Sequence, residues 1–200
     1  AGFGAQDDLA KLAAAMLLSF EGTIYLYQGE EIGQTETDIE FHELTDPPGI
    51  TFWPDYKGRD GCRTPMVWDG SANGGFTTGK PWLPVKAPQL ARNVASQDGI
   101  AGSVLEFYRA MLAFRRNSGA LVAGNTTFFD LPEPLLGFRR DDGAVPVTCV
   151  FNLSAAPVSV GVKGDAALTG PVAGAVLSQG ALLLGPNGFA WIFGSVNLTI

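Results

Sequence analysis

The residues best suited to chemistry lie in two short segments of this 200-residue sequence. Residues 27–33 read YQGEEIG and place two adjacent glutamates between glycines. Residues 58–68 read GRDGCRTPMVW and combine two arginines, an aspartate and a tryptophan in a predicted loop, where functional residues are common. Paired carboxylates can perform the acid–base chemistry of glycoside hydrolysis, and the planar arginine fork binds carboxylates and hydroxyl groups. These two segments are therefore the candidates for a site.

Glu30 and Glu31 follow a predicted strand at residues 23–27, a β-branched and aromatic apolar run that is typical of a strand buried on both faces. Adjacent strand residues point to opposite faces, so these two carboxylates cannot flank one bond. Retaining glycosidases hold their carboxyl groups about 5–5.5 Å apart. The favoured interpretation is structural, with one glutamate at the strand tip and the other in a supporting pair. No catalytic residue is assigned in this chain.

Arg59 either anchors a sugar through its donor fork or braces the loop through an ion pair with Asp60. For Asp60 and Arg63, the preferred interpretation is a structural role in which they hold the loop in place. Glu36 either reaches a substrate or is a solvated loop charge, and His42 receives no role. Several aromatic side chains of this stretch either stack on sugar rings or form a small core that holds the loop. They are Phe41, Phe52, Trp53, Tyr56, Trp68, Phe76 and Trp82.

The two segments, with GFTTGKPW at residues 75–82, resemble the α-glucosidase branch of the α-amylase superfamily, glycoside hydrolase family 13. The resemblance implies a (β/α)8 barrel whose catalytic carboxylates follow strands four, five and seven. Those strands would precede Ala1, so the chain is predicted to be a C-terminal fragment. The resemblance also implies that Arg59 lies at the floor of the glucose pocket, paired with an aspartate from early in the family's chain, and that Glu36 faces the next sugar. The predicted substrate-binding residues are Arg59, Glu36 and Asp60.

The N-terminal part of the sequence has the pattern of an α/β protein. Apolar residues recur at helical spacing from Leu9 to Phe20, behind two aspartates. Apolar residues show neither helical nor strand periodicity over residues 34–102, which are interpreted as a functional loop. A second helix is predicted to begin with the capping box Ser103–Glu106. Because one parallel strand cannot pair its own edges, residues 1–119 need a partner sheet. Together with this, the resemblance implies that they are the last β/α unit of a truncated (β/α)8 barrel.

After Gly119, short apolar runs alternate with turn residues about every ten positions, which is typical of an antiparallel β-sandwich. Residues 141–143 (DDG) predict a hairpin turn. The sandwich is predicted over residues 120–194, followed by a tail at 195–200. The predicted strands are Thr126–Leu131, Leu135–Arg139, Val145–Asn152, Val158–Val162, Ala181–Leu184 and Phe189–Phe193.

Composition excludes several classes of protein. The net charge of −7 disfavours nucleic acid as a partner, and the longest apolar run, Ala13–Leu18, is too short to span a bilayer. One histidine and two distant cysteines leave no zinc site at recognisable spacing and indicate reduced, structural thiols. We therefore expect no cofactor and no metal. No signal peptide is visible, so a cytoplasmic location is expected.

The function expected from the resemblance is that of a retaining, exo-acting α-glucosidase. Its partners would be small neutral α-glucosides and the missing N-terminal barrel half of the same polypeptide. The interval between Gly33 and Gly58 is shorter than in oligo-1,6-glucosidases, which favours a bacterial enzyme for maltose-type substrates. The alternatives are a transglucosylase or sucrose isomerase of the same family, and a non-catalytic amylase-like interaction protein. A free-standing carbohydrate-binding sandwich would leave residues 23–27 unexplained.

Overall fold

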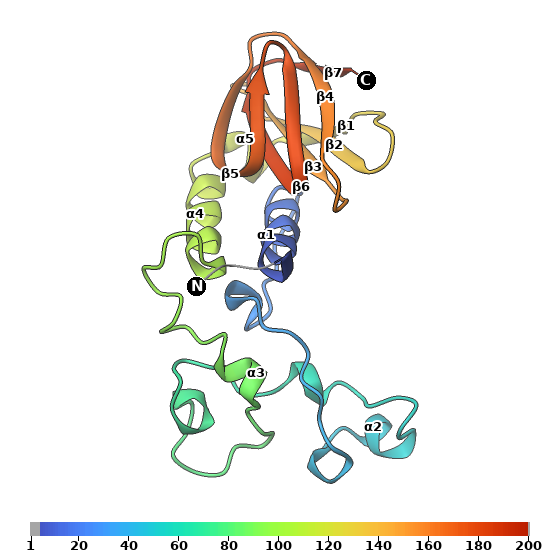
Figure 1. Ribbon diagram of the computed structural model, residues 1–200. Coiled ribbons are helices and arrows are strands. Elements are labelled where there is room, and N and C mark those ends of the chain that lie inside the picture. Colours follow the sequence, from blue (N-terminus) through green and yellow to red (C-terminus); the bar gives the residue numbers. More distant parts are fainter. Residues whose placement is uncertain (1–4, 200) are drawn as a thin grey trace. The chain divides into compact units, whose positions relative to one another are not determined.

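The computed structural model describes residues 5–199. The chain divides into two compact units. One unit comprises the chain up to Tyr25 together with the chain from Phe107 onward, and the other comprises Leu26–Glu106. Figure 1 shows the sheet in the first unit and short helices joined by long loops in the second. Among the described residues, no helix combines the length and the apolar character needed to cross a bilayer.

Both long helices predicted from the sequence are present. They are α1 (Ala5–Leu17) and α4 (Val104–Arg116), and the short α5 (Gly119–Ala123) follows α4. At the start of α4, the Ser103 hydroxyl accepts a hydrogen bond from the Glu106 amide at 3.1 Å. The Glu106 carboxylate accepts from the Gly99 amide at 2.9 Å, which ties the preceding loop to the helix start. The predicted capping residues therefore sit at the helix start, and the carboxylate also fixes the chain before it.

The sheet has seven antiparallel strands in the order β1-β2-β3-β6-β4-β7, with β5 paired to β6. The hairpin predicted at residues 141–143 joins β2 to β3, with Gly143 at φ 86°. The strand bounds are β1 Asn125–Phe128, β2 Leu135–Asp141, β3 Val147–Asn152, β4 Val158–Lys163, β5 Ala167–Ser178, β6 Ala181–Phe193 and β7 Asn197–Thr199.

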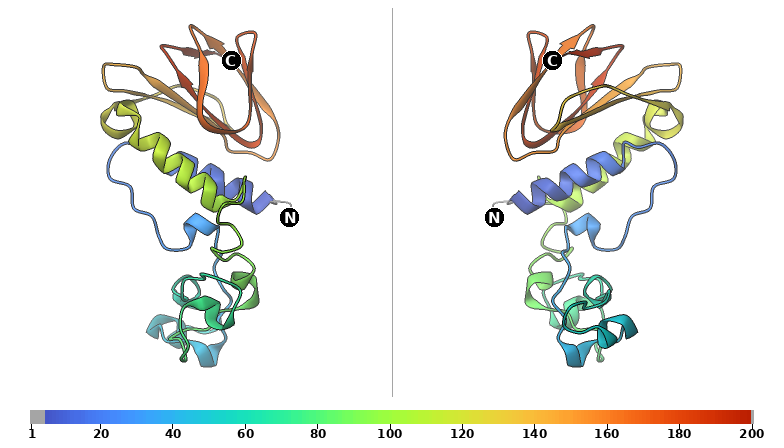
Figure 2. Two further views of the ribbon diagram at one scale, coloured as in Figure 1. Left: turned by 90° about the vertical axis from the view of Figure 1, so that its left-hand side faces the viewer. Right: turned by 90° about the vertical axis from the view of Figure 1, so that its right-hand side faces the viewer.

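The two layers expected of a sandwich are two parts of one curled sheet (Figures 1 and 2). The first part of β6, residues 181–184, pairs with β4, and its last part, residues 189–193, pairs with β3. β5 runs beside both parts, with register shifts between Thr169 and Ala175. The two predicted strands 181–184 and 189–193 are therefore one strand, and Asn187 between them has a positive φ of 53°.

Residues 195–200 were predicted to be a tail, and this prediction is wrong for the part that the structure describes. Asn197–Thr199 form β7, which pairs with Gly161–Lys163 of β4. Backbone groups at a sheet edge are stabilised by a further strand, and Leu198 adds to the apolar core beside it. The division of the chain also differs from the boundary predicted at residue 119. The first unit includes α1 and most of α4 together with the sheet.

The sheet is buried on both faces around β3 and β6. On its concave side, aliphatic residues from the two parts of the curl pack together: Val150, Val160, Val162, Leu182, Leu184, Ala190, Ile192 and Val196. On the other side, α1 and α4 lie against the sheet (Figure 2), and an aromatic layer packs between α4 and β6. In this layer the Phe107 and Phe114 rings of α4 lie 5.4 Å from Phe189 and Trp191 respectively. The Trp191 indole donates to the Ser19 hydroxyl at 2.8 Å.

Two arginines bind the carbonyl groups that follow the C-terminal end of α1. Arg140, fully buried on β2, donates to the carbonyls of Ser19 at 2.7 Å and Gly124 at 2.6 Å. Arg115 of α4 donates to the carbonyls of Leu18 at 2.8 Å and Phe20 at 2.9 Å, among others. Helix ends leave such carbonyls without partners and carry partial negative charge, so cations are favoured there. Burial lowers the pKa of both guanidinium groups, which stay charged nonetheless.

The segment 23–27 was predicted to be a buried strand, and among the described residues it is neither buried nor paired. It has no assigned secondary structure, and Tyr25, Leu26 and Tyr27 are 83%, 40% and 50% exposed. An apolar run of strand length becomes a strand only when a neighbouring strand satisfies its backbone groups. No described strand lies in that position.

The predicted loop 34–102 is ordered as short helices within the 26–106 unit. One small buried core holds it, in which Ile32, Met66 and Leu105 pack together. Two ring pairs, Phe41–Trp53 and Phe76–Trp82, lie farther along the chain. The short helices are η1 Glu30–Ile32, η2 Phe41–Glu43, α2 Pro47–Thr51, η3 Asp60–Cys62, η4 Ala72–Gly75 and α3 Ala87–Leu90.

Candidate functional site

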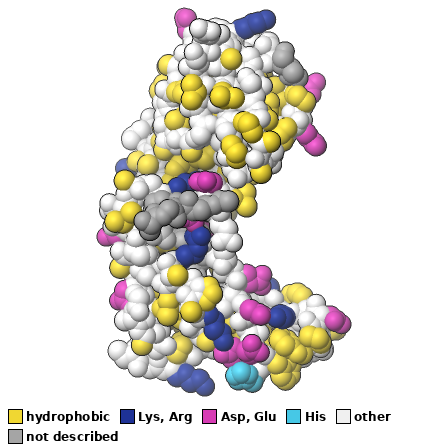
Figure 3. Space-filling model, in the orientation of Figure 1, with side chains coloured by type: hydrophobic (Ala, Val, Ile, Leu, Met, Phe, Trp, Pro, Cys, Tyr) yellow, Lys and Arg dark blue, Asp and Glu magenta, His cyan; other side chains and the backbone are white. Residues whose placement is uncertain are grey.

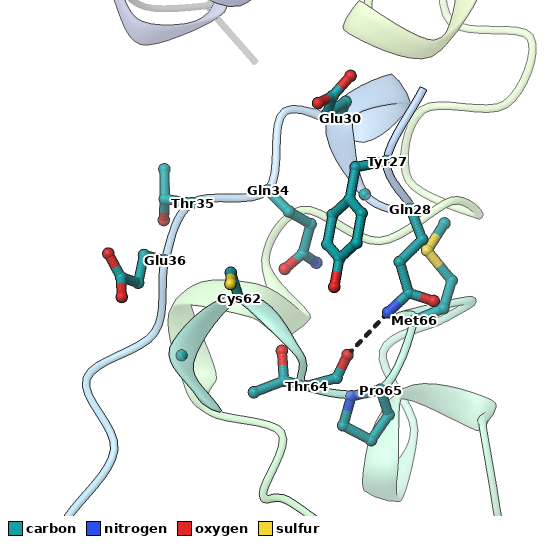
Figure 4. Close-up of a pocket in the computed structure, with 12 residues that line it drawn as sticks. Tyr27, Gln28, Glu30, Gln34, Thr35, Glu36, Cys62, Thr64, Pro65 and Met66 are labelled. Carbon is teal, nitrogen blue, oxygen red and sulfur yellow. Dashed lines mark hydrogen bonds between the residues drawn. The ribbon is translucent and has the colours of Figure 1, made fainter. Parts of the chain in front are cut away.

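Both sequence segments meet at a small cavity of about 90 Å³ in the 26–106 unit. Its walls come from residues 27–30, 34–36, 61–62 and 64–66. Figure 4 shows the Tyr27 and Gln34 side chains extending toward Thr64, across from the η3 helix that carries Cys62. Sites for whole small-molecule ligands are usually about 300–1,000 Å³, so this cavity holds one polar group or a few waters and not a complete sugar.

Glu30 and Glu31 lie on the η1 turn and not on a strand tip. Gly29 and Gly33 flank the turn in left-handed conformation, which glycine adopts without steric cost. The Glu31 carboxylate accepts a hydrogen bond from the Gly29 amide at 2.7 Å, which closes the turn on itself. Glu30 lines the cavity, and its carboxylate points away from the Tyr27 ring (Figure 4). The two glutamates thus take separate positions, one inside the turn and one at the cavity rim.

Glu36 lies where the chain that follows η1 passes beside η3. The Thr37 amide donates to the Gly61 carbonyl at 3.0 Å, and a Cβ at Gly61 would lie 2.4 Å from the Thr37 carbonyl oxygen. Only glycine allows this close approach at position 61. Glu36 is exposed and lines both the 90 Å³ cavity and an adjoining space of about 310 Å³. Its carboxylate is therefore accessible to a ligand.

Asp60 is 2% exposed and accepts hydrogen bonds within its own unit. The donors are the Thr45 amide at 2.6 Å, the Asp46 amide at 2.8 Å and the Thr45 hydroxyl at 3.1 Å. Burial alone would raise the pKa of Asp60, but these hydrogen bonds and the Arg63 charge outweigh it and hold the pKa below 3.8. The ionised carboxylate thus joins residues 45–46 to η3.

Arg59 shares a buried carboxylate with Arg63. Asp46, 5% exposed, accepts from the Arg59 amide at 2.8 Å, and its oxygens lie 3.6 Å from the Arg59 Nε and 3.9 Å from an Arg63 guanidinium nitrogen. The Arg59 side chain is nevertheless 59% exposed. It lies outside the residues that line the cavity, one turn of η3 from Cys62, whose thiol donates to the Arg59 carbonyl at 3.1 Å. Arg59 is therefore anchored by Asp46 at its amide and Nε, and its guanidinium group stays exposed.

Three glutamine side chains fix the walls of the cavity: Gln28 is exposed, whereas Gln89 and Gln97 are buried. Gln28 donates to the Thr64 carbonyl at 3.1 Å (Figure 4), and Gln89 donates to the Thr64 hydroxyl. Gln97 donates to the Ile32 carbonyl at 2.8 Å and so holds the turn that carries Glu30. Hydrogen bonds of this kind position a loop because leaving any partner unsatisfied in a buried site costs about 1–3 kcal/mol.

Asp46 and these glutamines are site residues that sequence reasoning missed. Asp46 directly precedes Pro47 at the start of α2, a pattern that indicates a helix N-cap and not an arginine partner. Across residues 5–199, no cluster of three or more His, Cys, Asp or Glu side chains could hold a metal ion. Cys62 and Cys149 are free thiols, and burial raises the pKa of Cys149 to about 12.

The pKa of Asp60 gives a first prediction. Because the folded-state pKa is depressed, the ionised carboxylate stabilises the loop above pH 3.8, and this contribution is lost as the pH falls below 3.8 through the folded value. The Thr45 and Asp46 amide protons, followed by NMR, should titrate with a midpoint below 3.8. Asp60→Asn should abolish that titration and destabilise the unit by about 1–3 kcal/mol, because the neutral amide oxygen that takes the place of the carboxylate oxygen is a weaker acceptor for the Thr45 and Asp46 amides. The exposed Asp55→Asn is the control. A midpoint at or above 3.8 would contradict the assigned hydrogen bonds.

Comparison with known proteins places this chain. Residues 3–124 match the alpha amylase catalytic domain family. A probable alpha-glucosidase of Rhizobium meliloti is 49% identical over 148 residues, which cover 74% of this chain and 27% of the relative. An oligo-1,6-glucosidase of Heyndrickxia coagulans is 32% identical over 177 residues, covering 79% of this chain and 32% of the relative.

Solved structures agree with this match. The alpha-glucosyl transfer enzyme XgtA has a TM-score of 0.89 and 42% identity, covering 94% of this chain and 36% of that protein. The trehalulose synthase MutB from Pseudomonas mesoacidophila MX-45 has a TM-score of 0.82 and 28% identity, covering 96% and 39%. The chain therefore belongs to the α-amylase family, in its α-glucosidase branch. It spans about a third or less of the length of the curated relatives named above.

Proposed function

We propose that this chain is the C-terminal part of a retaining, exo-acting α-glucosidase that releases terminal glucose from small neutral α-glucosides such as maltose. The observation that carries the proposal is Arg59, whose base is fixed by Asp46 and whose fork is exposed beside the glutamate-lined cavity. The similarity to a probable alpha-glucosidase over 74% of this chain supports it. The net charge of −7 suits a neutral substrate.

The proposal includes the position of residues 23–27 as the last strand of a (β/α)8 barrel. The exposure of Tyr25, Leu26 and Tyr27 supports it, because strands of a parallel barrel are apolar on both faces and need neighbours on both edges. The longer polypeptide would supply those neighbours and the catalytic carboxylates.

In the proposed reaction, a carboxylate of the longer polypeptide attacks the anomeric carbon while a second one protonates the leaving oxygen. Water then attacks the glycosyl ester, assisted by the second carboxylate acting as base, so the anomeric configuration is retained. This chain's residues would bind and orient the sugar: Arg59 donates to the hydroxyl groups of the terminal glucose, and Glu36 accepts from the next sugar. Asp46 fixes the base of Arg59, and Asp60 fixes the loop that carries it.

A second candidate function is transfer of the glucosyl group to a sugar instead of water. The similarity of this chain to a glucosyl transfer enzyme, at 42% sequence identity, is the observation that favours this second function. The two functions share the covalent intermediate, so products distinguish them. With maltose as the sole substrate, hydrolysis yields only glucose, whereas transfer yields trisaccharides.

The proposal predicts the activity of two proteins. The isolated 200-residue chain should not hydrolyse maltose or p-nitrophenyl α-glucoside, because no carboxylate pair among its described residues lies in position for the chemistry. The longer polypeptide should hydrolyse both, and proton NMR should show α-glucose as the first product. Activity of the isolated chain that Glu30→Gln abolishes would contradict the assignment, and so would β-glucose as the first product of the longer polypeptide.

A further inference from the structure

We propose that a second groove of the 26–106 unit, lined by Trp82, binds a neutral sugar ring. The groove lies between residues 42–45 and residues 80–85, with Asn73 at its end, and shares no lining residue with the cavity beside Glu36. The choice of a sugar as the ligand class rests on the proposed function, whereas the existence of a ligand site rests on the geometry of the groove.

The groove has the size of a ligand site. Its volume is about 510 Å³, within the usual range of about 300–1,000 Å³ and well above the 90 Å³ of the other cavity. Its lining mixes apolar side chains, including Pro81, Pro84 and Val85, with polar ones. Figure 3 shows hydrophobic side chains lying among charged ones on the surface of this unit. Such mixed lining suits a ligand that has apolar ring faces and polar edges.

Trp82 is held rigidly although it is exposed. Its indole nitrogen donates to the Arg63 carbonyl at 3.0 Å, and its ring meets Phe76 at 5.1 Å and 87°, edge to face. Even so, 57% of the residue is exposed. The polar atom of the indole is thus already satisfied, and an apolar ring surface stays open in a fixed orientation. A platform fixed in advance binds with little loss of side-chain entropy, and sugar rings present the C–H faces that fit it.

The polar side chains of the groove favour a neutral ligand over an ion. Both oxygens of the Glu43 carboxylate lie 2.7 Å from the Lys86 ammonium nitrogen, and hydrogen bonding to Lys86 is the main cause of the lowered pKa of Glu43. Its charge is therefore already matched. The exposed side chains of His42 and Lys80 line the groove and can donate to hydroxyl groups.

Tryptophan indole signals test this proposal directly. The sequence has four tryptophans, so a 15N-labelled chain gives four indole signals, which Trp→Phe variants assign. During titration with maltose, the Trp82 signal should shift and saturate, while Trp53, Trp68 and the buried Trp191 should not. Lys80→Ala should weaken binding several-fold without changing the fold. An unmoved Trp82 signal, or equal and unsaturated shifts at Trp68, would overturn the proposal. So would a Trp82 shift caused by inorganic phosphate and not by maltose.

Saturation-transfer NMR from the protein to maltose measures sugar binding by a matched pair of variants. Trp82→Ala should weaken binding at least about tenfold. Trp68→Ala removes an equally accessible indole, 52% exposed and outside the groove, and should leave binding unchanged. Equal effects of the two variants would contradict the proposal.

Arg59→Ala separates this inference from the proposed function. It should leave the Trp82 titration unchanged, because Arg59 does not line the groove. If Arg59→Ala abolishes the titration, the sugar occupies the site beside Arg59 and the groove proposal fails while the function stands. If the longer polypeptide has no glucosidase activity but the Trp82 shift persists, the proposed function fails and the groove stands as a sugar site.

Discussion

Arg140→Met is expected to lower the free energy of unfolding of the sheet-containing unit by about 3 kcal/mol. The substitution keeps the apolar stem but removes two charged hydrogen bonds, to the carbonyls of Ser19 and Gly124. A hydrogen bond to a charged group contributes about 1.5–3 kcal/mol, and the two carbonyls would stay buried without their donor. The loss should therefore exceed that of an ordinary surface substitution several-fold.

Urea unfolding followed by near-ultraviolet circular dichroism measures this loss, since Trp191 lies in the same aromatic layer. Arg139→Met is the matched control, because Arg139 is adjacent on β2 and is only partly buried. The control should change the midpoint little. Arg140→Lys should recover only part of the stability, because one ammonium cannot reproduce the two donors of the fork. If Arg140→Met and Arg139→Met unfold at the same urea concentration, the helix-end contacts do not carry the stability assigned to them.

Arg59→Ala in the longer polypeptide is expected to reduce kcat/KM roughly 30- to 5,000-fold, which corresponds to a loss of about 2–5 kcal/mol of transition-state stabilisation. The charged anchor for the terminal glucose would be lost. The fold should hardly change, because the Arg59 side chain is 59% exposed and Asp46 keeps Arg63 and the residue-59 amide as partners. Steady-state kinetics on maltose, with thermal unfolding measured in parallel, separates the two effects.

Arg63→Ala is the matched control for Arg59→Ala. Arg63 approaches the same Asp46 carboxylate and is 43% exposed at its side chain, but we assign it only a bracing role. Its loss should reduce kcat/KM much less. Arg59→Lys should rescue little, since it lacks the planar fork. If turnover of Arg59→Ala is near normal at both limiting and saturating substrate, Arg59 is a loop brace and the pocket assignment is wrong.

Local signals in the sequence were enough to predict part of the fold. Helical spacing located α1 behind two aspartates and α4 behind a capping serine, and short apolar runs between turn residues located β2, β3 and β4. β5 was missed because Gly170 and Gly174 interrupt it at positive φ and its register shifts remove the alternation. Residues 23–27 form no strand within this chain, because strand formation depends on a partner that the run itself does not specify.

The candidate site was less predictable, since its pairings link distant residues. Arg59 and Glu36 could be selected from residue type, but the carboxylate that holds Arg59 lies thirteen positions earlier, at Asp46. The burial of Asp60 depends on amides of Thr45 and Asp46, and amides carry no sequence signature. Glu31, in contrast, caps its own turn through a contact two residues away.

The hydrogen bond between Trp191 and Ser19 joins residues 172 positions apart. A ribosome adds about 5–20 residues per second, so α1 would leave it roughly 10–35 seconds before β6 is complete. During that time the apolar side of α1, with Leu12, Ala15 and Leu18, lacks the sheet that buries it in the finished protein. During synthesis the apolar side of α1 is therefore exposed for this interval, and a chaperone that binds nascent apolar segments would have a target there.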